Sequence, residues 1–380
     1  MARHRAAPDR RTQADPATTT GAVPSPRRAP DDDSRTAWVD AAKGLCIALV
    51  VLHHVVMFLK PHGLVPAPLD LLNTALASLR MPLFFLASGL FLASALDRPW
   101  RVMAHRRVAL FAWLYLLWTT AQFALFAVLP TGTAPATATQ SATGLLLSPV
   151  VPAPSLWFLY ALAVFSLAAR LLRRVPAAVL LVVTAVSSAF VGAGTVEIGS
   201  FGWEFMARYA FFFVLGWHGR RLVGRLASAT SPPRVLAGGL LAGAAAAAAV
   251  LLGVRDVPGV AFALNLLAVG VGVLLAAEIV RWRAGRVVVA LGRATLPIYL
   301  TNVLVIGGLT ALTAVLTAGW PLPAVAQYAV VGLVAAVTVV ATLGVHRLLL
   351  AARCGWLYDL PGRWAVRSGH GGPARPAPRA

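Results

Sequence analysis

Long apolar runs alternate with short polar connections along most of the chain. The runs lie at 37–58, 69–96, 107–129, 155–174, 176–193, 203–218, 235–253, 258–280, 293–316 and 323–350. Most of them reach about 18 residues, the length that an α-helix needs to cross a bilayer. The pattern predicts an all-α, polytopic membrane protein with about ten transmembrane helices.

The connections between the runs differ in charge in a regular way. Arginines gather in every second connection, at 98–107, 170–174, 220–234 and 281–286. The connections between these contain only Lys60 and Arg255 as cations. Because positively charged connections stay in the cytoplasm, the alternation predicts an even number of helices, with the N- and C-termini both cytoplasmic.

The composition excludes several classes of protein. Hydrophobic residues make up 59% of the chain and charged residues 12%, whereas a soluble domain carries about 25% charged residues. The net charge of +20 could indicate a nucleic-acid partner, but the positive-inside rule explains the arginines without one. The expected surroundings are therefore the bilayer of the plasma membrane. The two cysteines, Cys46 and Cys354, predict neither a disulfide framework nor a metal site.

The chain divides into three parts. Residues 1–36, rich in Arg and Pro, predict a disordered cytoplasmic arm, and residues 351–380 predict a basic, Gly- and Pro-rich cytoplasmic tail. Residues 37–350 form the membrane domain between them. The uncharged loop at 130–154 would lie outside, either folded over a cavity or disordered. No internal repeat is visible, which counts mildly against an inverted-repeat transporter.

The first apolar run carries the densest set of ionisable residues, in the stretch "DAAKGLCIALVVLHH". At about 100° per residue, Asp40, Lys43 and His54 share one stripe of a helix, and His53 lies about 100° away from it. Asp40 and Lys43 could form an anchor pair at the cytoplasmic interface or belong to a site. His54 lies about 16 Å deeper. It could be a buried neutral histidine or a catalytic base, since imidazole exchanges protons near neutrality.

Other polar residues in apolar runs also need a reason, because an ionisable group in hydrocarbon costs about 2.5–3.5 kcal/mol. Arg80, in "RMPLFFLASG", could reach an interface or hold an anion. Glu204 and Arg208 are four residues apart, so they could form an ion pair, or Arg208 could line a site. Trp157 could be an interfacial aromatic or a pocket wall. The role of Asn302, in "LGRATLPIYLTN", is left open between structure and site.

Several of these motifs occur in the same order in a known family. Through "WVDAAKGLCIALVVLHH", "RMPLFFLASGLF", "SLWFLYAL", "RYAFFFVLGW" and "LGRATLPIYLTN", the chain resembles the integral-membrane acyltransferase-3 family, particularly its fucose 4-O-acetylase-like branch. The resemblance implies a ten-helix enzyme that moves an acyl group, usually acetyl from acetyl-CoA, to an acceptor. It implies that His54 is the central catalytic residue, with Lys43 as its motif partner and Arg80 at a polar catalytic position. Asn302 stands where the family often has His.

The expected reaction is O-acylation of a cell-envelope glycan, glycolipid or secreted natural product, with acyl-CoA as the donor and no permanently bound cofactor. His54 would act as general base or as covalent acyl carrier. Arg80 or Arg208 would stabilise the oxyanion, and Asp40, Glu204, Trp157 and Asn302 would contribute to substrate binding. Arg101, Arg106 and Arg107 offer charge for the CoA phosphates, although topology alone also explains these three arginines. The oligomeric state is left open.

A secondary transporter or exporter is the main alternative. The stripe formed by Asp40, Lys43 and His54 would also suit a proton relay, because intramembrane ionisable residues often mark ion pathways. The order of the family-like motifs and the missing repeat favour the enzyme. A non-catalytic membrane partner with the same fold is disfavoured because Lys43 and His54 are both present.

Overall fold

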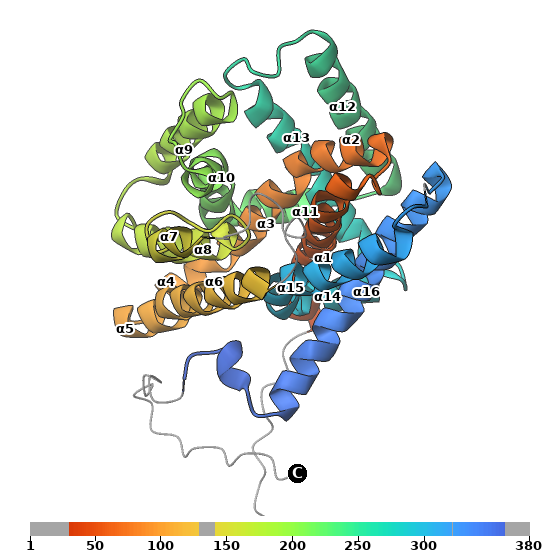
Figure 1. The fold of residues 1–380 in the computed structure, drawn as a ribbon. Coiled ribbons are helices and arrows are strands. Elements are labelled where there is room, and N and C mark those ends of the chain that lie inside the picture. Colours follow the sequence, from red (N-terminus) through yellow and green to blue (C-terminus); the bar gives the residue numbers. More distant parts are fainter. Residues whose placement is uncertain (1–29, 129–140, 321, 362–380) are drawn as a thin grey trace, which may run out of the picture.

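The computed structural model describes residues 30–128, 141–320 and 322–361, and all regular elements in this part of the chain are helices (Figure 1). Its long helices are α1 (Pro30–Leu59), α6 (Leu110–Val128), α8 (Trp157–Leu171), α9 (Ala177–Gly192), α10 (Phe201–His218), α12 (Pro232–Leu251), α13 (Val260–Ile279), α15 (Thr295–Thr317) and α16 (Ala324–Ala351). The shorter helices are η1 (Lys60–His62), α2 (Ala67–Ala75), α3 (Ala77–Leu90), α4 (Leu92–Leu96), α5 (Trp100–Met103), π-helical η2 (Ala104–Ala109), α7 (Ala142–Leu147), α11 (Arg220–Ser228), α14 (Gly285–Arg293) and η3 (Gly355–Leu357).

Within the described residues, each predicted apolar run is mostly helical, and seven of the helical segments are long and apolar enough to cross a membrane. These segments are Ala37–His62, Ala67–Leu90, Trp100–Val128, Pro232–Leu251, Val260–Ile279, Thr295–Thr317 and Ala324–Ala351. Helices α8 and α9 are apolar but shorter, and α10 has 18 residues with Glu204 and Arg208 inside it. Length and composition therefore identify a multi-pass membrane protein with seven clear candidate spans.

The first candidate membrane span begins at Ala37, where the apolar run is predicted to begin, but the helix that contains it is longer. Helix α1 begins at Pro30, so the last residues of the expected arm belong to this helix. Proline is well suited to the first turn of a helix, because its missing N–H would have no partner there. The remainder of the predicted arm, residues 1–29, and the tail beyond residue 361 lie outside the described residues.

Helix α1 occupies the middle of the bundle and packs against α3, α13, α14, α15 and α16 (Figure 1). Its contact with α14 is close because two glycines face the other helix. A Cβ atom on Gly44 would lie 1.8 Å from the carbonyl oxygen of Val288, and one on Gly292 would lie 1.7 Å from that of Asp40. The small residues thus allow backbone to touch backbone, as is common between membrane helices.

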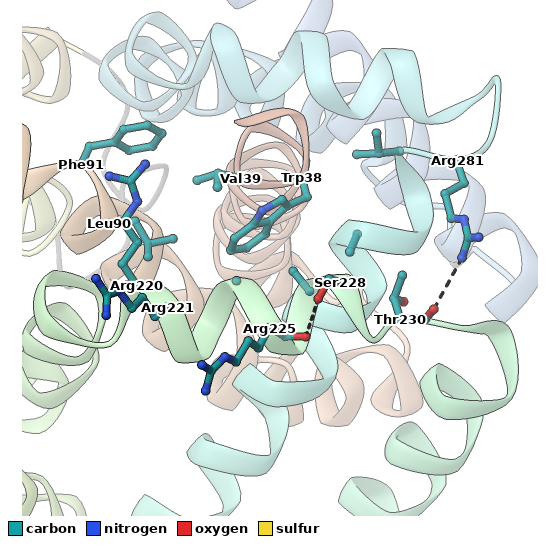
Figure 2. A pocket seen from close by; sticks show the side chains of 14 residues that line it. Trp38, Val39, Leu90, Phe91, Arg220, Arg221, Arg225, Ser228, Thr230 and Arg281 are labelled. Atoms are coloured by element: carbon teal, nitrogen blue, oxygen red, sulfur yellow. Dashed lines mark hydrogen bonds between the residues drawn. The ribbon is translucent and has the colours of Figure 1, made fainter. Parts of the chain in front are cut away.

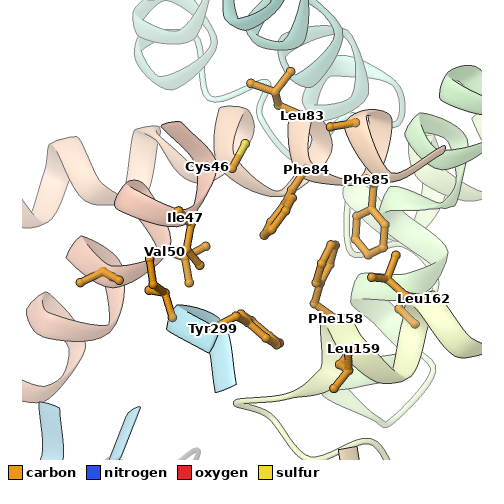
Figure 3. Packing of buried hydrophobic residues seen from close by; sticks show 14 of the residues in the cluster. Cys46, Ile47, Val50, Leu83, Phe84, Phe85, Phe158, Leu159, Leu162 and Tyr299 are labelled. Carbon is orange, nitrogen blue, oxygen red and sulfur yellow. The ribbon is translucent and has the colours of Figure 1, made fainter. Parts of the chain in front are cut away.

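The core lies between α1, α3, α8 and α15, where Figure 3 shows aliphatic residues of α1 facing aromatic rings from the other three helices. The rings of Phe84 and Phe158 stack with centroids 4.5 Å apart, and Tyr299 meets Phe158 edge-on at 5.8 Å. The Tyr299 hydroxyl donates to the Ser155 carbonyl at 3.1 Å. Because a buried hydroxyl needs a partner, this bond gives Tyr299 a structural role in the core.

The second membrane segment is interrupted between α2 and α3, at Leu76. A proline, Pro82, lies further on inside α3 and does not mark this break. Further along α3, a Cβ atom on Gly89 would lie 2.2 Å from the Phe213 carbonyl oxygen of α10. Ser88 donates to the Phe84 carbonyl of its own helix at 2.8 Å. The Ser88–Gly89 pair thus serves helix packing, as the sequence indicates.

Two segments outside the long helices are held by side chains of α6. The Tyr115 hydroxyl donates to the Ser148 carbonyl at 2.8 Å and accepts from the Ala153 amide at 2.7 Å. The later part of the uncharged loop is therefore ordered, and residues 129–140 lie outside the described residues. The Trp118 indole donates to the Leu357 carbonyl at 2.8 Å. This bond ties the start of the C-terminal tail to the bundle.

Candidate active site

His54 projects from α1 toward Asn302 on α15, with its Nδ1 atom 2.7 Å from the amide oxygen. The amide nitrogen of Asn302 donates to the carbonyls of Ile298, at 3.0 Å, and Tyr299, at 2.7 Å. Since both amide hydrogens are used on backbone oxygens, Oδ1 is the atom that faces the imidazole, and it can only accept. His54 therefore carries its proton on Nδ1. Its Nε2 keeps a lone pair, and no hydrogen bond to this atom is present within the described residues.

Arg80 lies on α3, buried at 5% exposure, and it is held by Asn73 of α2. Its Nη1 donates to the backbone carbonyl of Asn73 at 3.0 Å and to the side-chain oxygen at 3.1 Å. Its Nε is buried without a hydrogen-bond partner. Among the described residues, no carboxylate pairs with this guanidinium. A buried cation that lacks a counter-ion has the charge and the free donor needed to hold an anion.

The same asparagine connects Arg80 with the first of the two adjacent histidines. Because Oδ1 of Asn73 accepts from Arg80, Nδ2 is the atom that donates to Nδ1 of His53, at 3.2 Å. A neutral His53 therefore carries its proton on Nε2. The ring centroids of His53 and His54 lie 5.6 Å apart. In these neighbouring rings the proton is on Nε2 of His53 and on Nδ1 of His54.

Together these residues form a polar cluster, His53–His54–Asn73–Arg80–Asn302, contributed by α1, α2, α3 and α15. Asn73 links Arg80 to His53, whose ring lies beside that of His54. The cluster combines an imidazole nitrogen with a free lone pair and a cation with a free donor. Chemically, this set can accept a proton and stabilise a developing negative charge.

The predicted stripe on α1 separates into two sites in the structure. Asp40 lies 3.7 Å from Lys43 and 3.2 Å from Nε of Arg293 on α14, and the Lys43 ammonium lies 4.2 Å from the centre of the Phe91 ring. Between Lys43 and His54 the stripe contains buried aliphatic residues, Ile47 and Val50. Asp40 and Lys43 thus lie at one end of the helix, and the His54 cluster lies at the other.

The structure changes the interpretation of the residues proposed on α10 and α8. Glu204 does not pair with Arg208. Its Oε1 instead accepts from the backbone amides of Ile198, at 3.3 Å, and Gly199, at 3.2 Å. The amides that precede α10 need acceptors, and the carboxylate supplies one.

Arg208 donates to the Val191 carbonyl at the end of α9, at 3.2 Å, and its Nε is buried without a partner. Trp157 is 5% exposed, with its ring centroid 5.3 Å from that of Phe205. It is therefore a core aromatic and not a lipid-facing one. Neither Arg208 nor Trp157 makes a hydrogen bond to the polar cluster within the described residues.

The three arginines proposed for the donor phosphates lie in different surroundings. Arg107 donates to the Phe91 carbonyl at 3.3 Å, whereas Arg101 and Arg106 are exposed. An open cavity of about 960 Å³ lies nearby, but it is lined by a different set of arginines, from α11 and the residues after α13 (Figure 2). Sequence reasoning missed this set, because arginines in a cytoplasmic connection are the ordinary consequence of topology.

Asn73 is the other residue that sequence reasoning missed. Its signal is present in "DLLNTALASLR", where Asn73 and Arg80 are seven residues apart. Seven residues make about two helical turns, so both side chains lie on one face. His53, which lies off the predicted stripe of α1, shares Asn73 with Arg80. Within the described residues, no group of three or more metal-ligating side chains is present.

The fold and the polar cluster define a class of protein, a multi-pass helical membrane protein with a proton-accepting, anion-stabilising site among its helices. A family model described as an acyltransferase domain matches residues 36–345. The chain therefore belongs to the acyltransferase-3 family. This membership supports an enzyme that transfers acyl groups other than amino-acyl groups.

One curated relative is the inner membrane protein YcfT of Escherichia coli strain K12, which is 30% identical over 156 residues. The match covers 36% of this chain and 44% of that protein, so less than half of the relative's length is spanned. No solved structure matches the chain significantly.

Proposed function

We propose that the protein is a membrane O-acyltransferase that moves an acyl group, acetyl in the simplest case, from cytoplasmic acyl-CoA to a hydroxyl group. The acceptor class is a cell-envelope glycan, a glycolipid or a secreted natural product, as in the fucose 4-O-acetylase-like branch that the motifs resemble. The observation that carries the proposal is the hydrogen bond from His54 to Asn302, which leaves Nε2 free as a base. Family membership supplies the reaction class.

In the proposed reaction, His54 Nε2 takes the proton of the acceptor hydroxyl as its oxygen attacks the thioester carbonyl carbon. The new C–O bond forms and the C–S bond breaks, and the CoA thiolate leaves with a proton returned from His54. The tetrahedral intermediate carries negative charge on oxygen, which the free Nε–H of Arg80 stabilises. Asn302 holds the imidazole in the required tautomer throughout. No permanently bound cofactor takes part.

The topology proposed for this reaction is ten crossings of the plasma membrane, with both termini in the cytoplasm. The seven clear candidate spans, the two shorter apolar helices α8 and α9, and α10 together supply ten. The alternation of arginine-rich and arginine-poor connections supports the orientation. In this topology the CoA end of the donor approaches from the Lys43 end of α1, and the acceptor approaches from the His54 end.

Cysteine labelling tests this topology. In a variant in which Cys46 and Cys354 are replaced by Ser, Lys60→Cys should react with a membrane-impermeant maleimide from outside intact cells. Arg173→Cys should react only after the membrane is opened. The opposite pattern would contradict the orientation, whatever the enzyme's activity.

The structure gives a reason to prefer an enzyme to a proton-coupled transporter. A relay along α1 would need polar groups or water between Lys43 and His54, which are separated by about 16 Å. Ile47 and Val50 fill that part of the stripe, at 1% and 0% exposure. The apolar stretch between Lys43 and His54 therefore supports two separate sites on one helix.

The test of the proposed function is transfer of label from radioactive acetyl-CoA to envelope glycans and lipids in membranes containing the protein. His54→Ala, at equal expression, should abolish transfer, because a positioned general base contributes about 10²–10⁴-fold. His62→Ala is the matched control, since His62 lies exposed in η1. Near-normal transfer by His54→Ala would refute the catalytic assignment. A transporter would transfer no label even in the wild type.

A further inference from the structure

A large open cavity of about 960 Å³ lies beside the Lys43 end of α1 (Figure 2). Helix α11 forms one side of it and contributes Arg220, Arg221 and Arg225. Trp38 of α1 and Phe91, which follows α3, contribute aromatic rings to its wall. The volume is within the range of about 300–1,000 Å³ that small-molecule and cofactor sites occupy.

The cavity carries a strong positive charge. Its lining contains four arginines and no acidic residue. Arg281 pairs with Glu278 at 3.2 Å, so its charge is neutralised. For Arg220, Arg221 and Arg225, by contrast, no carboxylate or carbonyl binds the guanidinium within the described residues. Figure 2 shows these three guanidinium groups spread along α11 and pointing in different directions. A row of unpaired guanidinium groups favours a ligand with more than one phosphate, because each group can bind phosphate oxygens in a bidentate manner.

The rest of the lining is apolar and leaves room for more than phosphate. Trp38 offers a flat indole face, and Val39 and Leu90 add aliphatic surface. A Cβ atom placed on Gly224, between the arginines of α11, would meet no other atom within 4 Å. A surface with separate cationic and aromatic parts suits a phosphorylated nucleotide, whose base can lie against an aromatic ring.

The position of the cavity links it to the candidate active site. Phe91 lines the cavity, and its ring lies 4.2 Å from the Lys43 ammonium. From Lys43, α1 runs on to His54 over about 16 Å. A donor whose charged end binds in the cavity must therefore carry its thioester over this distance, past the buried Ile47 and Val50, to reach His54.

We propose that this cavity binds the phosphate-bearing nucleotide end of the acyl donor, and that Arg220, Arg221 and Arg225 are the recognition residues. The inference rests on the proposed function, because the donor is part of that proposal. It replaces the earlier expectation for Arg101 and Arg106, which do not line the cavity. The phosphates of an anionic lipid headgroup share this chemistry, and the experiment distinguishes the two sources.

The kinetic test compares two donors with the purified full-length protein in nanodiscs of phosphatidylcholine. With acetyl-CoA, the variant Arg220→Gln/Arg221→Gln/Arg225→Gln should show KM raised by about tenfold or more, because charge-assisted bonds to phosphate are lost. Its kcat should stay within about twofold of the wild-type value, since His54 is untouched. With acetyl-pantetheine, which lacks the nucleotide phosphates, the variant and the wild type should behave alike. Equal KM values with acetyl-CoA would overturn the proposal.

Two controls separate recognition from the effect of charge and of folding. The variant Arg173→Gln/Arg174→Gln/Arg283→Gln removes the same charge from exposed cytoplasmic positions outside the cavity. It should leave KM for acetyl-CoA unchanged, and an equal rise would mean that only net charge matters. Gly224→Ala should be tolerated, whereas Gly224→Glu places a carboxylate among the arginines and should raise KM as the triple variant does. Unchanged KM in Gly224→Glu would contradict the proposed position.

A binding measurement keeps the inference independent of catalysis. Adenosine 3′,5′-bisphosphate should bind the wild type in calorimetry and bind the α11 triple variant about tenfold more weakly or worse. If the wild type transfers no acyl group but binds the bisphosphate through these arginines, the proposed reaction fails and the cavity assignment stands. The same measurement is repeated in nanodiscs with about 30% phosphatidylglycerol, an anionic lipid. If this lipid abolishes binding of the bisphosphate, the cavity is a lipid site and the inference is wrong. If the wild type does not bind the bisphosphate at all, the cavity is not a nucleotide site and the inference is also wrong.

Discussion

The most informative perturbation of the site is the replacement of Asn302 by Leu. The Asn302 side chain is fully buried, and Oδ1 accepts the Nδ1 proton of His54 at 2.7 Å. Leu has a similar size but no acceptor, so the Nδ1–H group would lose its partner in an apolar environment. Leaving such a buried donor unsatisfied costs about 1–3 kcal/mol. Thermal denaturation of the purified protein should show a loss of stability of this order.

The effect on catalysis follows from the tautomer. The active tautomer of His54 has its proton on Nδ1 and a lone pair on Nε2. Without an acceptor at Nδ1, this tautomer is no longer favoured over the other one by the hydrogen bond, which is worth about 1–3 kcal/mol. The population of the active tautomer would therefore fall by about 5–150-fold. We therefore expect kcat to fall within that range, while KM for the donor stays constant.

The assay is steady-state transfer from labelled acetyl-CoA, combined with ¹⁵N NMR of the His54 ring. In the wild type, Nδ1 should give the signal of a protonated nitrogen and Nε2 that of an unprotonated one. Asn302→Asp is the comparison: one carboxylate oxygen can still accept from Nδ1 and should preserve the tautomer, while the other faces the Ile298 and Tyr299 carbonyls and should lower stability. Equal loss of activity in the Leu and Asp variants, or a wild-type spectrum with the proton on Nε2, would refute the reasoning.

Three further predictions concern other parts of the molecule. Arg80→Gln should lower kcat by about 10²–10³-fold, because a buried oxyanion donor is lost; activity equal to that of the wild type would exclude the role. Gly292→Ala should destabilise the protein by about 1–3 kcal/mol, because the new Cβ atom would collide with the Asp40 carbonyl. Gly239→Ala is the control: its Cβ atom would meet nothing within 4 Å, so it should not lower the denaturation temperature. Glu204→Ala should cost about 0.5–1.5 kcal/mol, because the Ile198 and Gly199 amides lose their acceptor; Glu204→Gln, which keeps an acceptor, should cost less in the same denaturation assay.

The hydropathy pattern accounts for the helices, because a chain in lipid must satisfy its backbone polar groups within each helix. It does not account for the interruption at Leu76 or for the early start of α1 at Pro30. The interruption lies in a stretch whose helical signal is continuous on both sides. Local propensity therefore cannot locate it, and the packing of α2 and α3 against other helices decides its position.

The sequence by itself determined which residues need a partner. His54, Arg80 and Asn302 stand out because polar groups in apolar helices are costly. Only the tertiary structure decided how they are paired. His54 and Asn302 are 248 residues apart, and Asn73 joins Arg80 to His53. The physical reason is that helices that are apolar on all sides have no amphipathic face to fix their rotation. Close packing of side chains fixes it instead, and so determines which polar atoms meet and which arginines line the cavity.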